Sequence, residues 1–302
     1  MIIEDIIKFS ENKKSKIFFN HSIKNLNWFN IGGKTRVYFQ AENLLELINF
    51  LKIYNKRGKI FILGAGSNVL FKDDLYEGVV IKLGNNFKNI SLLSPDTIVA
   101  GANVLDKNLS NFAKENNIGG LEFLSCIPGS VGGGIRMNAG CYQREFKDIL
   151  VSVQAIDYNG KVLTFPSNKI KFSYRKSNLE KNLIFLSGTF KGKFKKCDLI
   201  DVEIKQLIKK KKSSQPSRIK TSGSTFKNPI KDSKLKVWEL IKNSVPSHPS
   251  FGDATISDYH SNFFVNKNNA TSTDMLNLIK FVKKKVKNKY DIDIELEVVI
   301  VE

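Results

Sequence analysis

The spacing of hydrophobic residues alternates along the chain between helical and strand patterns. Within 43–56, apolar residues lie three and four positions apart, as at Leu44, Leu47 and Leu51, and this spacing predicts an amphipathic helix. The same spacing predicts further helices over 104–116, 200–212, 236–243 and 274–290. The last of these follows Thr271-Ser-Thr-Asp274, which has the residue pattern of a capping box.

Short apolar runs predict strands at 59–63, 78–83, 97–100, 150–157, 161–165 and 183–190. Tyr158-Asn-Gly160 is typical of a tight hairpin turn between two of them. The chain ends on a strict alternation that predicts a strand over Asp293–Val301. Glu295 and Glu297 share the polar face of that strand, so the pattern does not distinguish them. Mixed helices and strands of this kind indicate the α+β class.

Length and composition limit the possible classes of protein. A chain of 302 residues is long enough for two domains. We find neither the basic start and apolar core of a signal peptide nor an apolar run long enough for a membrane span. The three cysteines are too widely spaced for a disulfide framework or a metal set. We therefore expect a cytoplasmic protein without a metal site and without a membrane partner.

The net charge of +19 raises the question of nucleic-acid binding. Lysines are spread along the chain, and the dense runs Lys209–Lys212 and Lys283–Lys285 fall within amphipathic helical patterns. A solvated basic face explains such runs without a nucleic acid, so we expect no nucleic-acid partner. The same charge would attract a small anionic substrate.

Two glycine-rich segments indicate a ligand with phosphate groups. The first glycine station is Gly64-Ala-Gly-Ser-Asn68, directly after a predicted strand, and the second is Pro128-Gly-Ser-Val-Gly-Gly-Gly134. Glycine lets backbone N–H groups converge on an anion such as a pyrophosphate. The stretch Cys126–Gly140 shows no helical or strand periodicity and is expected to be irregular. A Rossmann fingerprint fails because position 69 is Val, and a Walker loop before Gly33-Lys34-Thr35 fails because position 28 is Trp.

An ordered set of motifs runs from about residue 27 to residue 299, and together they resemble the UDP-N-acetylenolpyruvoylglucosamine reductase family. The motifs are Asn30-Ile-Gly-Gly33, Ile62-Leu-Gly-Ala-Gly-Ser-Asn-Val-Leu70, Ile127-Pro-Gly-Ser-Val-Gly-Gly133, Met137-Asn-Ala-Gly140, Phe172-Ser-Tyr-Arg175, Gly223-Ser-Thr-Phe-Lys-Asn-Pro229 and Leu296-Glu-Val298. No tyrosine-bearing insertion lies between Ser177 and Ser224, which resembles the shorter subtype of the family.

The resemblance implies an FAD enzyme that uses NADPH to reduce a UDP-sugar enolpyruvate to UDP-N-acetylmuramate in peptidoglycan synthesis. It implies a vanillyl-alcohol-oxidase-type FAD-binding domain over 1–197, with two α/β subdomains at about 1–85 and 86–197. A C-terminal α+β substrate domain would follow over 198–302. We expect a monomer.

The resemblance also assigns three catalytic residues: Arg175, Ser224 and Glu297. A guanidinium binds a carboxylate in a fixed fork, so Arg175 suits the substrate carboxylate. Ser224 would donate a proton to the second enolpyruvyl carbon. Glu297 would stabilise the same charge, which requires that it be protonated or act through a water. Read without the family, the local pattern favours a strand-end arginine in a surface ion pair for Arg175 and a turn serine for Ser224. Glu297 would be a solvent-facing glutamate of the terminal strand.

The remaining assignments concern the ligands. Residues expected at the substrate are Tyr174, Lys212, Lys227 and Asn228, with Lys212 at the diphosphate. Residues expected at the cofactor are Gly64, Ala65, Gly66, Ser67, Asn68, Ile127, Pro128, Gly129, Ser130, Gly133, Asn138, Ala139 and Gly140. The three histidines, His21, His248 and His260, lie outside the span between the glycine stations, so we expect FAD to bind non-covalently.

Two other interpretations stay open. One is a different flavoprotein oxidoreductase of the same fold, such as an alcohol oxidase. The other is a basic binding module without catalytic activity. A yellow purified protein would exclude the second, and substrate-dependent NADPH consumption would separate the first from the reductase.

Overall fold

A computed structural model describes residues 2–11, 13–54, 57–216, 219–230, 232–247 and 249–302. By their contacts they form two compact units. Unit 1 comprises Met1–Phe19, Val37–Ala65 and Glu77–Lys211, and unit 2 comprises Asn20–Arg36, Gly66–Tyr76 and Lys212–Glu302. Neither unit is a single run of sequence. The last two positions of the helix predicted over 43–56, and His248, lie outside the described residues.

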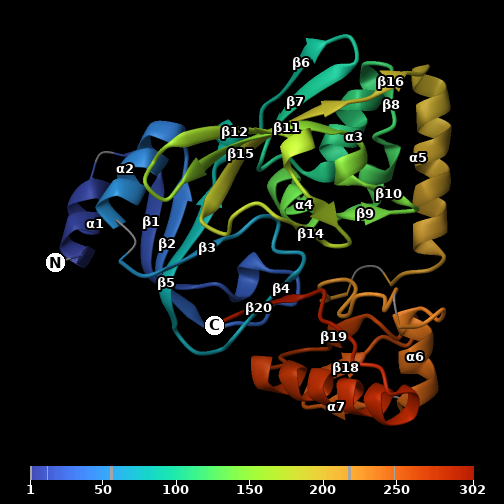
Figure 1. Ribbon diagram of the computed structural model, residues 1–302. Helices are drawn as coiled ribbons and strands as arrows, with labels where there is room; N and C mark the ends of the chain where they lie inside the picture. Colours follow the sequence, from blue (N-terminus) through green and yellow to red (C-terminus); the bar gives the residue numbers. More distant parts are fainter. Residues whose placement is uncertain (1, 12, 55–56, 217–218, 231, 248) are drawn as a thin grey trace. The chain divides into compact units, whose positions relative to one another are not determined.

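A four-stranded sheet has the order β1-β2-β5-β3. Its strands are β1 (Lys16–Ser22), β2 (Lys34–Ala41), β3 (Lys59–Ile62) and β5 (Tyr76–Leu83). Helices α1 (Ile2–Ser10) and α2 (Leu44–Tyr54) lie beside it (Figure 1). The Phe39 ring of β2 stacks on the Phe50 ring of α2 with centroids 4.0 Å apart, and both side chains are fully buried. Aromatic burial of this size fixes the helix on the sheet.

The second sheet of unit 1 is antiparallel and has the order β12-β11-β15-β7-β6. Its strands are β6 (Ile90–Ser94), β7 (Thr97–Gly101), β11 (Leu150–Asp157), β12 (Val162–Pro166) and β15 (Leu183–Lys191). Helix α4 (Val131–Met137) packs on β15, where a Cβ atom at Gly188 would lie 3.0 Å from the Ile135 side chain. The helix therefore approaches the sheet closely at a position without a side chain.

Shorter elements complete unit 1. The two-residue strands pair as β8 (Ile118–Gly119) with β16 (Lys193–Phe194), β9 (Gly140–Cys141) with β10 (Arg144–Glu145), and β13 (Phe172–Ser173) with β14 (Lys176–Ser177). The other helices are α3 (Asp106–Glu115) and α5 (Cys197–Lys212). The 3₁₀ helices η2 (Asn85–Phe87), η3 (Glu122–Cys126), η4 (Phe146–Asp148) and η5 (Ser167–Lys169) lie in the connections.

Unit 2 has its own hydrophobic core around α6 (Val237–Ser244) and α7 (Ser272–Tyr290). A small antiparallel sheet comprises β17 (Ser250–Phe251), β18 (Ala254–Ile256) and β19 (Phe264–Asn266). Strand β4 (Val69–Phe71) pairs in parallel with β20 (Val299–Val301), and η1 (Lys24–Leu26) precedes them. Helix α7 begins with the predicted capping box, because Thr271 Oγ1 accepts from Asp274 N at 3.0 Å and Asp274 accepts from Thr271 N at 2.9 Å.

Two sequence-based predictions of local structure are wrong in part. The stretch Cys126–Gly140 is not irregular throughout, because it contains helix α4. Val131 and Ile135 of that helix are fully buried, and their burial overrides the low helix propensity of the glycines. The terminal strand covers only Val299–Val301 instead of Asp293–Val301. The apolar residues of the predicted alternation are nevertheless buried, since Ile294 and Val298 lie in the core.

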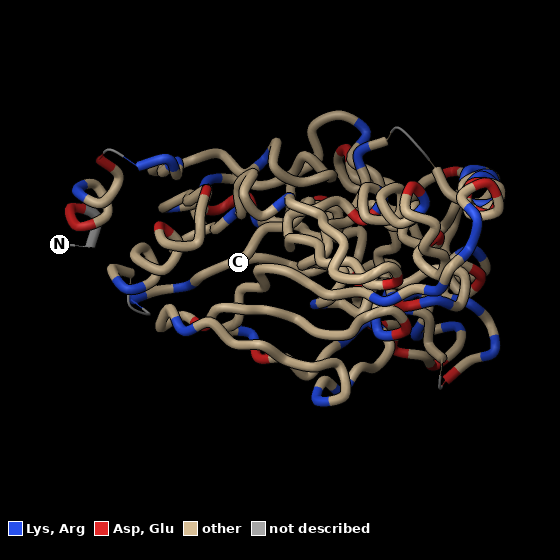
Figure 2. The backbone as a smooth tube through the Cα atoms, turned by 90° about the horizontal axis from the view of Figure 1, so that it is seen from above, with Lys and Arg blue, Asp and Glu red and all other residues tan. Residues whose placement is uncertain are grey.

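No helix in the described parts of the chain is both long and apolar enough to cross a membrane. Figure 2 shows Lys and Arg spread over many segments of the chain, interspersed with Asp and Glu. On α5, for example, Lys205 pairs with Asp201 at 2.6 Å. Exposed pairs of this kind contribute about 0–1 kcal/mol each. Their main effect is that neighbouring carboxylates partly neutralise individual lysines.

Candidate active site

Gly64, which begins the first glycine station, lies against the second station within unit 1. A Cβ atom added at Gly64 would lie 2.7 Å from Ser130 Oγ. Lys82 Nζ donates a hydrogen bond to the Gly64 carbonyl at 2.8 Å. Burial lowers the pKa of Lys82, and the charge of Lys88 acts in the same direction. Two closely apposed loops with an ammonium group beside one of them form an environment suited to an anionic ligand.

The three consecutive glycines of α4 have different neighbours. A Cβ at Gly132 would lie 3.1 Å from the Ala102 side chain, and one at Gly134 would lie 2.2 Å from the Phe146 ring. Both positions therefore need glycine for packing inside the protein. Gly133 is exposed, and the nearest atom to its Cβ would be Ser130 Oγ at 3.7 Å. The fold gives no steric reason for glycine at 133, and a ligand that lies against this turn would supply one.

At two other positions of the stations, packing within the protein also explains why the residue is glycine. Gly66 has a φ of +71°, and its Cβ would lie 2.2 Å from the Leu26 carbonyl oxygen. A Cβ at Gly129 would lie 2.6 Å from Asp106 Oδ2. Close packing therefore accounts for both glycines, and it also places a carboxyl group directly behind the second station.

A strained hairpin presents Arg175. This residue lies in the turn between β13 and β14 with a φ of +57°, a conformation that costs a side-chain-bearing residue about 1–3 kcal/mol. Arg175 Nη2 donates to the Gly140 carbonyl at 3.1 Å, and its guanidinium lies 4.9 Å from the centre of the Tyr174 ring. The turn and these two contacts fix the position of the guanidinium.

Buried Asn138 connects this hairpin to the second glycine station. It caps α4 with a φ of +45°, in the left-handed region. Its amide nitrogen donates to Glu145 Oε2 at 2.9 Å and to the Ser173 carbonyl at 3.2 Å, and its oxygen accepts from Lys147 N at 3.0 Å. Both amide hydrogens are thus engaged within the protein. This arrangement makes Asn138 a support for the Arg175 turn.

In unit 2, the segment that carries Ser224 lies against the segment that carries Glu297. Glu297 N donates to the Thr225 carbonyl at 2.9 Å, and Lys227 N donates to the Glu295 carbonyl at 2.8 Å. Ser224 itself forms a bridge with Phe263 and is half-buried. The backbone therefore brings two of the predicted catalytic residues together, although they are far apart in sequence.

Glu295 and Glu297, which the alternating pattern places on the same face, differ in exposure and in their contacts. The Glu295 side chain is 76% exposed and pairs with Lys227 Nζ at 3.1 Å. Glu297 is half-buried, and its carbonyl accepts a hydrogen bond from Asn68 Nδ2 at 2.9 Å. Glu297 is thus fixed by the first glycine station on one side and by the Ser224 segment on the other, whereas Glu295 belongs to the surface.

Comparisons with known proteins agree with this arrangement. Residues 215–301 match the profile of the UDP-N-acetylenolpyruvoylglucosamine reductase C-terminal domain, and residues 35–166 match that of an FAD binding domain. The chain is 57% identical to a UDP-N-acetylenolpyruvoylglucosamine reductase of Pelagibacter ubique over 99% of both chains. It is 40% identical to the reductase of Rickettsia typhi, over 92% of this chain and 93% of that one.

The chain belongs to the UDP-N-acetylenolpyruvoylglucosamine reductase family. The crystal structure of the Thermus caldophilus reductase superposes with a TM-score of 0.82 at 28% identity, covering 96% of this chain and 99% of that one. The predicted fold class, α+β with an FAD-binding domain before a C-terminal domain, is confirmed. The predicted family membership is confirmed as well.

The other residues predicted at the substrate have ordinary structural partners. Lys212 is exposed at the end of α5, and its carbonyl accepts from the Tyr259 hydroxyl at 3.4 Å. Asn228 Oδ1 accepts from Val237 N at 3.1 Å at the start of α6. Their contacts with a sugar nucleotide stay predictions.

Sequence reasoning did not single out Lys211, the neighbour of Lys212. Lys211 is half-buried, and its Nζ donates to the Cys126 carbonyl at 2.8 Å, next to the second glycine station. Burial lowers its pKa. The signal was present in the sequence, because Lys211 continues the buried spacing of Ile200 and Ile204 on the same face of α5.

Asp106 is a second residue that sequence reasoning missed. Its side chain is fully buried, and within the described ranges neither carboxyl oxygen has a hydrogen-bond partner. Burial raises its pKa well above the usual range, which favours the neutral form of the carboxyl group. An acidic residue at the start of a helix usually faces solvent, so nothing in the sequence distinguished this one.

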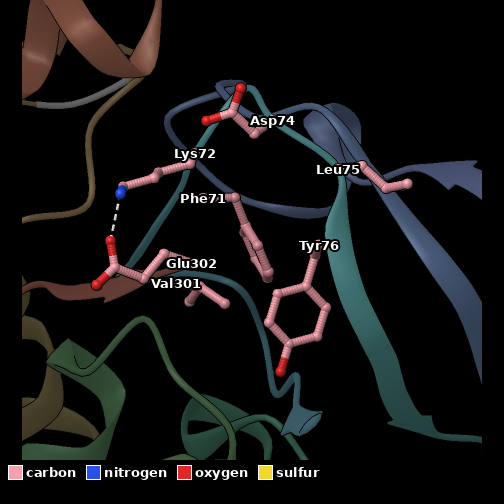
Figure 3. A pocket seen from close by; sticks show the side chains of 7 residues that line it. All are labelled: Phe71, Lys72, Asp74, Leu75, Tyr76, Val301 and Glu302. Carbon is pink, nitrogen blue, oxygen red and sulfur yellow. Dashed lines mark ion pairs between the residues drawn. The ribbon is translucent and has the colours of Figure 1, made fainter. Parts of the chain in front are cut away.

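A cavity of about 200 Å³ lies elsewhere in unit 2, where β4 and β20 pair (Figure 3). The rings of Phe71 and Tyr76 point toward it, and Lys72 pairs with Glu302 at its edge. None of the residues that line it was predicted to bind substrate or cofactor. The cavity is therefore separate from the predicted site residues.

Proposed function

We propose that this protein catalyses the FAD-dependent, NADPH-driven reduction of UDP-N-acetylglucosamine enolpyruvate to UDP-N-acetylmuramate, a step of peptidoglycan synthesis. The identity of 57% over 99% of both chains with a reductase of that name carries the proposal. The FAD binding domain over 35–166 and the exposed turn at Gly133 support the cofactor.

The chemistry defines what the protein must provide. The enolpyruvyl group is an electron-rich vinyl ether, so a hydride adds to its terminal carbon only if the neighbouring carboxylate takes up the developing charge as an enolate. When bound, FAD would supply the hydride, which it obtains from NADPH. The protein must hold the substrate carboxylate, stabilise the enolate and deliver a proton to the adjacent carbon.

We assign the first task to Arg175. Its guanidinium is fixed by the Gly140 carbonyl, the Tyr174 ring and the strained turn. A fixed guanidinium binds a carboxylate without first losing side-chain freedom. The charge of Arg175 would hold the carboxylate in the substrate and stabilise it more strongly as the enolate forms.

We assign delivery of the proton to Ser224 and further stabilisation of the enolate to Glu297. Their segments are joined by the hydrogen bond from Glu297 N to the Thr225 carbonyl at 2.9 Å, so the two side chains come from adjacent backbone. Ser224 would give its proton to the second enolpyruvyl carbon. Glu297 would assist with the charge, in its protonated form or through a water.

The remaining assignments follow the resemblance. We assign Tyr174, Lys212, Lys227 and Asn228 to the substrate, and the two glycine stations with Ile127, Asn138, Ala139 and Gly140 to non-covalently bound FAD. Residues 1–197 would form the FAD-binding domain and 198–302 the substrate domain. A monomeric state, a cytoplasmic location and the absence of a nucleic-acid partner stay predictions.

Purified protein should be yellow, and acid precipitation should release the chromophore into the supernatant. It should oxidise NADPH when the enolpyruvyl sugar nucleotide is added, and the product should be the lactyl ether by mass spectrometry. An alcohol oxidase of the same fold would leave NADPH unchanged under these conditions. Flavin that stays with the pellet would contradict non-covalent binding without affecting the reaction assignment.

The two glutamates provide a matched pair of variants. Glu297→Gln should slow the reduction of the enolpyruvyl substrate by at least about tenfold, since it removes a group at the developing charge. Glu295→Gln should change this rate less than about twofold, because it removes only an exposed pair with Lys227. Single-turnover absorbance measurements on both variants test this. Equal effects of the two changes would contradict the assignment of Glu297.

A further inference from the structure

Two of the three cysteines lie together beside the second glycine station. Cys126 ends η3, and Cys141 belongs to β9. Cys141 Sγ donates to the Phe123 carbonyl of the same 3₁₀ helix at 3.2 Å, and the two thiols are close enough to alter each other's ionisation. Cys126 is buried, whereas Cys141 is half-exposed. The fold therefore brings the Cys141 thiol to the 3₁₀ helix that Cys126 ends, although fourteen residues separate them in the sequence.

The surroundings make the two sulfurs unequal. The Cys141 thiol, followed by the Ser125 hydroxyl and the Lys211 ammonium, lowers the pKa of Cys126 to about 6, against the opposing effect of burial. The same interaction with Cys126 raises the pKa of Cys141. This lowered pKa favours the thiolate form of Cys126 at neutral pH. A thiolate beside a second thiol is the arrangement in which an oxidised sulfur is captured as a disulfide.

We propose that Cys126 and Cys141 form a redox pair that closes to a disulfide when a hydroperoxide such as hydrogen peroxide reaches it. The Cys126 thiolate attacks one peroxide oxygen and breaks the O–O bond, which gives Cys126 sulfenic acid and, after protonation, water. Cys141 sulfur then attacks the sulfenic sulfur and displaces a second water. Two thiols and one peroxide become one disulfide and two waters.

The disulfide would act on groups already assigned to the active site, and this consequence rests on the proposed function. Cys126 directly precedes Ile127 and Pro128 of the cofactor segment. Cys141 directly follows Gly140, whose carbonyl accepts from Arg175 Nη2 at 3.1 Å. A disulfide would tie β9 to η3 directly beside that carbonyl and would alter its position. A displacement of about 1 Å at a positioning group lowers a rate by up to about 10²-fold.

The FAD-loaded full-length protein should be treated with a small excess of hydrogen peroxide, alkylated and digested without reduction. We expect the number of alkylated thiols to fall from three to one, with a Cys126–Cys141 peptide pair that dithiothreitol separates. Substrate-dependent NADPH oxidation should fall about tenfold or more and return after dithiothreitol.

Three variants distinguish the outcomes. Cys126→Ser and Cys141→Ala should each lose the peptide pair and the reversible inactivation, whereas Cys197→Ser, which changes the third cysteine at the start of α5, should keep both. Failure to find the linked peptide in wild-type protein with an intact flavin spectrum would overturn the redox pair. A quantitative disulfide without loss of NADPH oxidation would overturn its regulatory effect. Because the peptide readout needs no turnover, it is independent of the proposed reaction.

Discussion

Ser224→Ala should retain FAD, be reduced by NADPH at a near-normal rate, and be reoxidised by the enolpyruvyl substrate at least about 10²-fold more slowly, the usual scale for loss of a positioned proton donor. Only the step that consumes the enolpyruvyl group needs a proton at its second carbon. Stopped-flow absorbance of the flavin measures the two half-reactions separately.

The structure makes this variant a clean test. Among the described residues, the Ser224 hydroxyl has no hydrogen-bond partner, and the bridge to Phe263 is made by the backbone. Its removal therefore leaves no buried group unsatisfied, and the free energy of unfolding should change by less than about 0.5 kcal/mol. A slow reaction in a normally stable protein would then reflect lost chemistry.

Ser222→Ala is the matched control. Ser222 lies in the same segment, is buried, and has an Oγ without a partner in the described part of the chain. Its removal should leave both half-reactions unchanged. If Ser224→Ala were reoxidised as fast as wild type, the serine would have no role in proton transfer and a bound water would replace it in the mechanism.

Gly133→Ala should stabilise the protein without FAD and weaken FAD binding. The added methyl group meets nothing closer than Ser130 Oγ at 3.7 Å, and alanine favours the helix over glycine by up to about 1 kcal/mol. In the complex, the same methyl would occupy space needed by the cofactor. Overpacking costs about 1–3 kcal/mol, which raises the Kd about 5- to 150-fold.

Thermal unfolding with and without FAD, together with the ratio of flavin to protein absorbance, measures both effects. Gly134→Ala is the control, because its methyl would lie 2.2 Å from the Phe146 ring and should lower the Tm of the protein without FAD. Unchanged FAD affinity in Gly133→Ala would mean that no cofactor atom approaches this turn.

Local pattern was sufficient for most regular elements. The strand predicted over 150–157 is β11, Leu150–Asp157, because its apolar run is bounded by clear turn residues. Thr271 and Asp274 form the predicted capping box, since the cap depends only on neighbouring residues. Helix α4 was missed, because three glycines lower helix propensity and only the burial of Val131 and Ile135 compensates.

The site was predictable to a similar extent. The sequence by itself determined the family, because an ordered set of motifs needs no coordinates to be recognised. Periodicity did not separate Glu295 from Glu297, since a two-residue period gives both the same face, and only the family motif Leu296-Glu-Val298 assigned Glu297. The tertiary structure shows what distinguishes them, because Glu295 pairs with Lys227 whereas the Glu297 carbonyl accepts from Asn68.

The glycines and cysteines also show which properties the sequence indicates and which only the structure reveals. Sequence alone indicated that something approaches the second glycine station, but it could not say which glycines face a ligand and which face Ala102 or Phe146. In the sequence Cys126 and Cys141 are widely spaced, whereas folding brings the Cys141 thiol to the 3₁₀ helix that Cys126 ends. Residue type and local order are properties of the chain, whereas what lies opposite each residue is decided by contacts between distant segments, which form only when the core is buried.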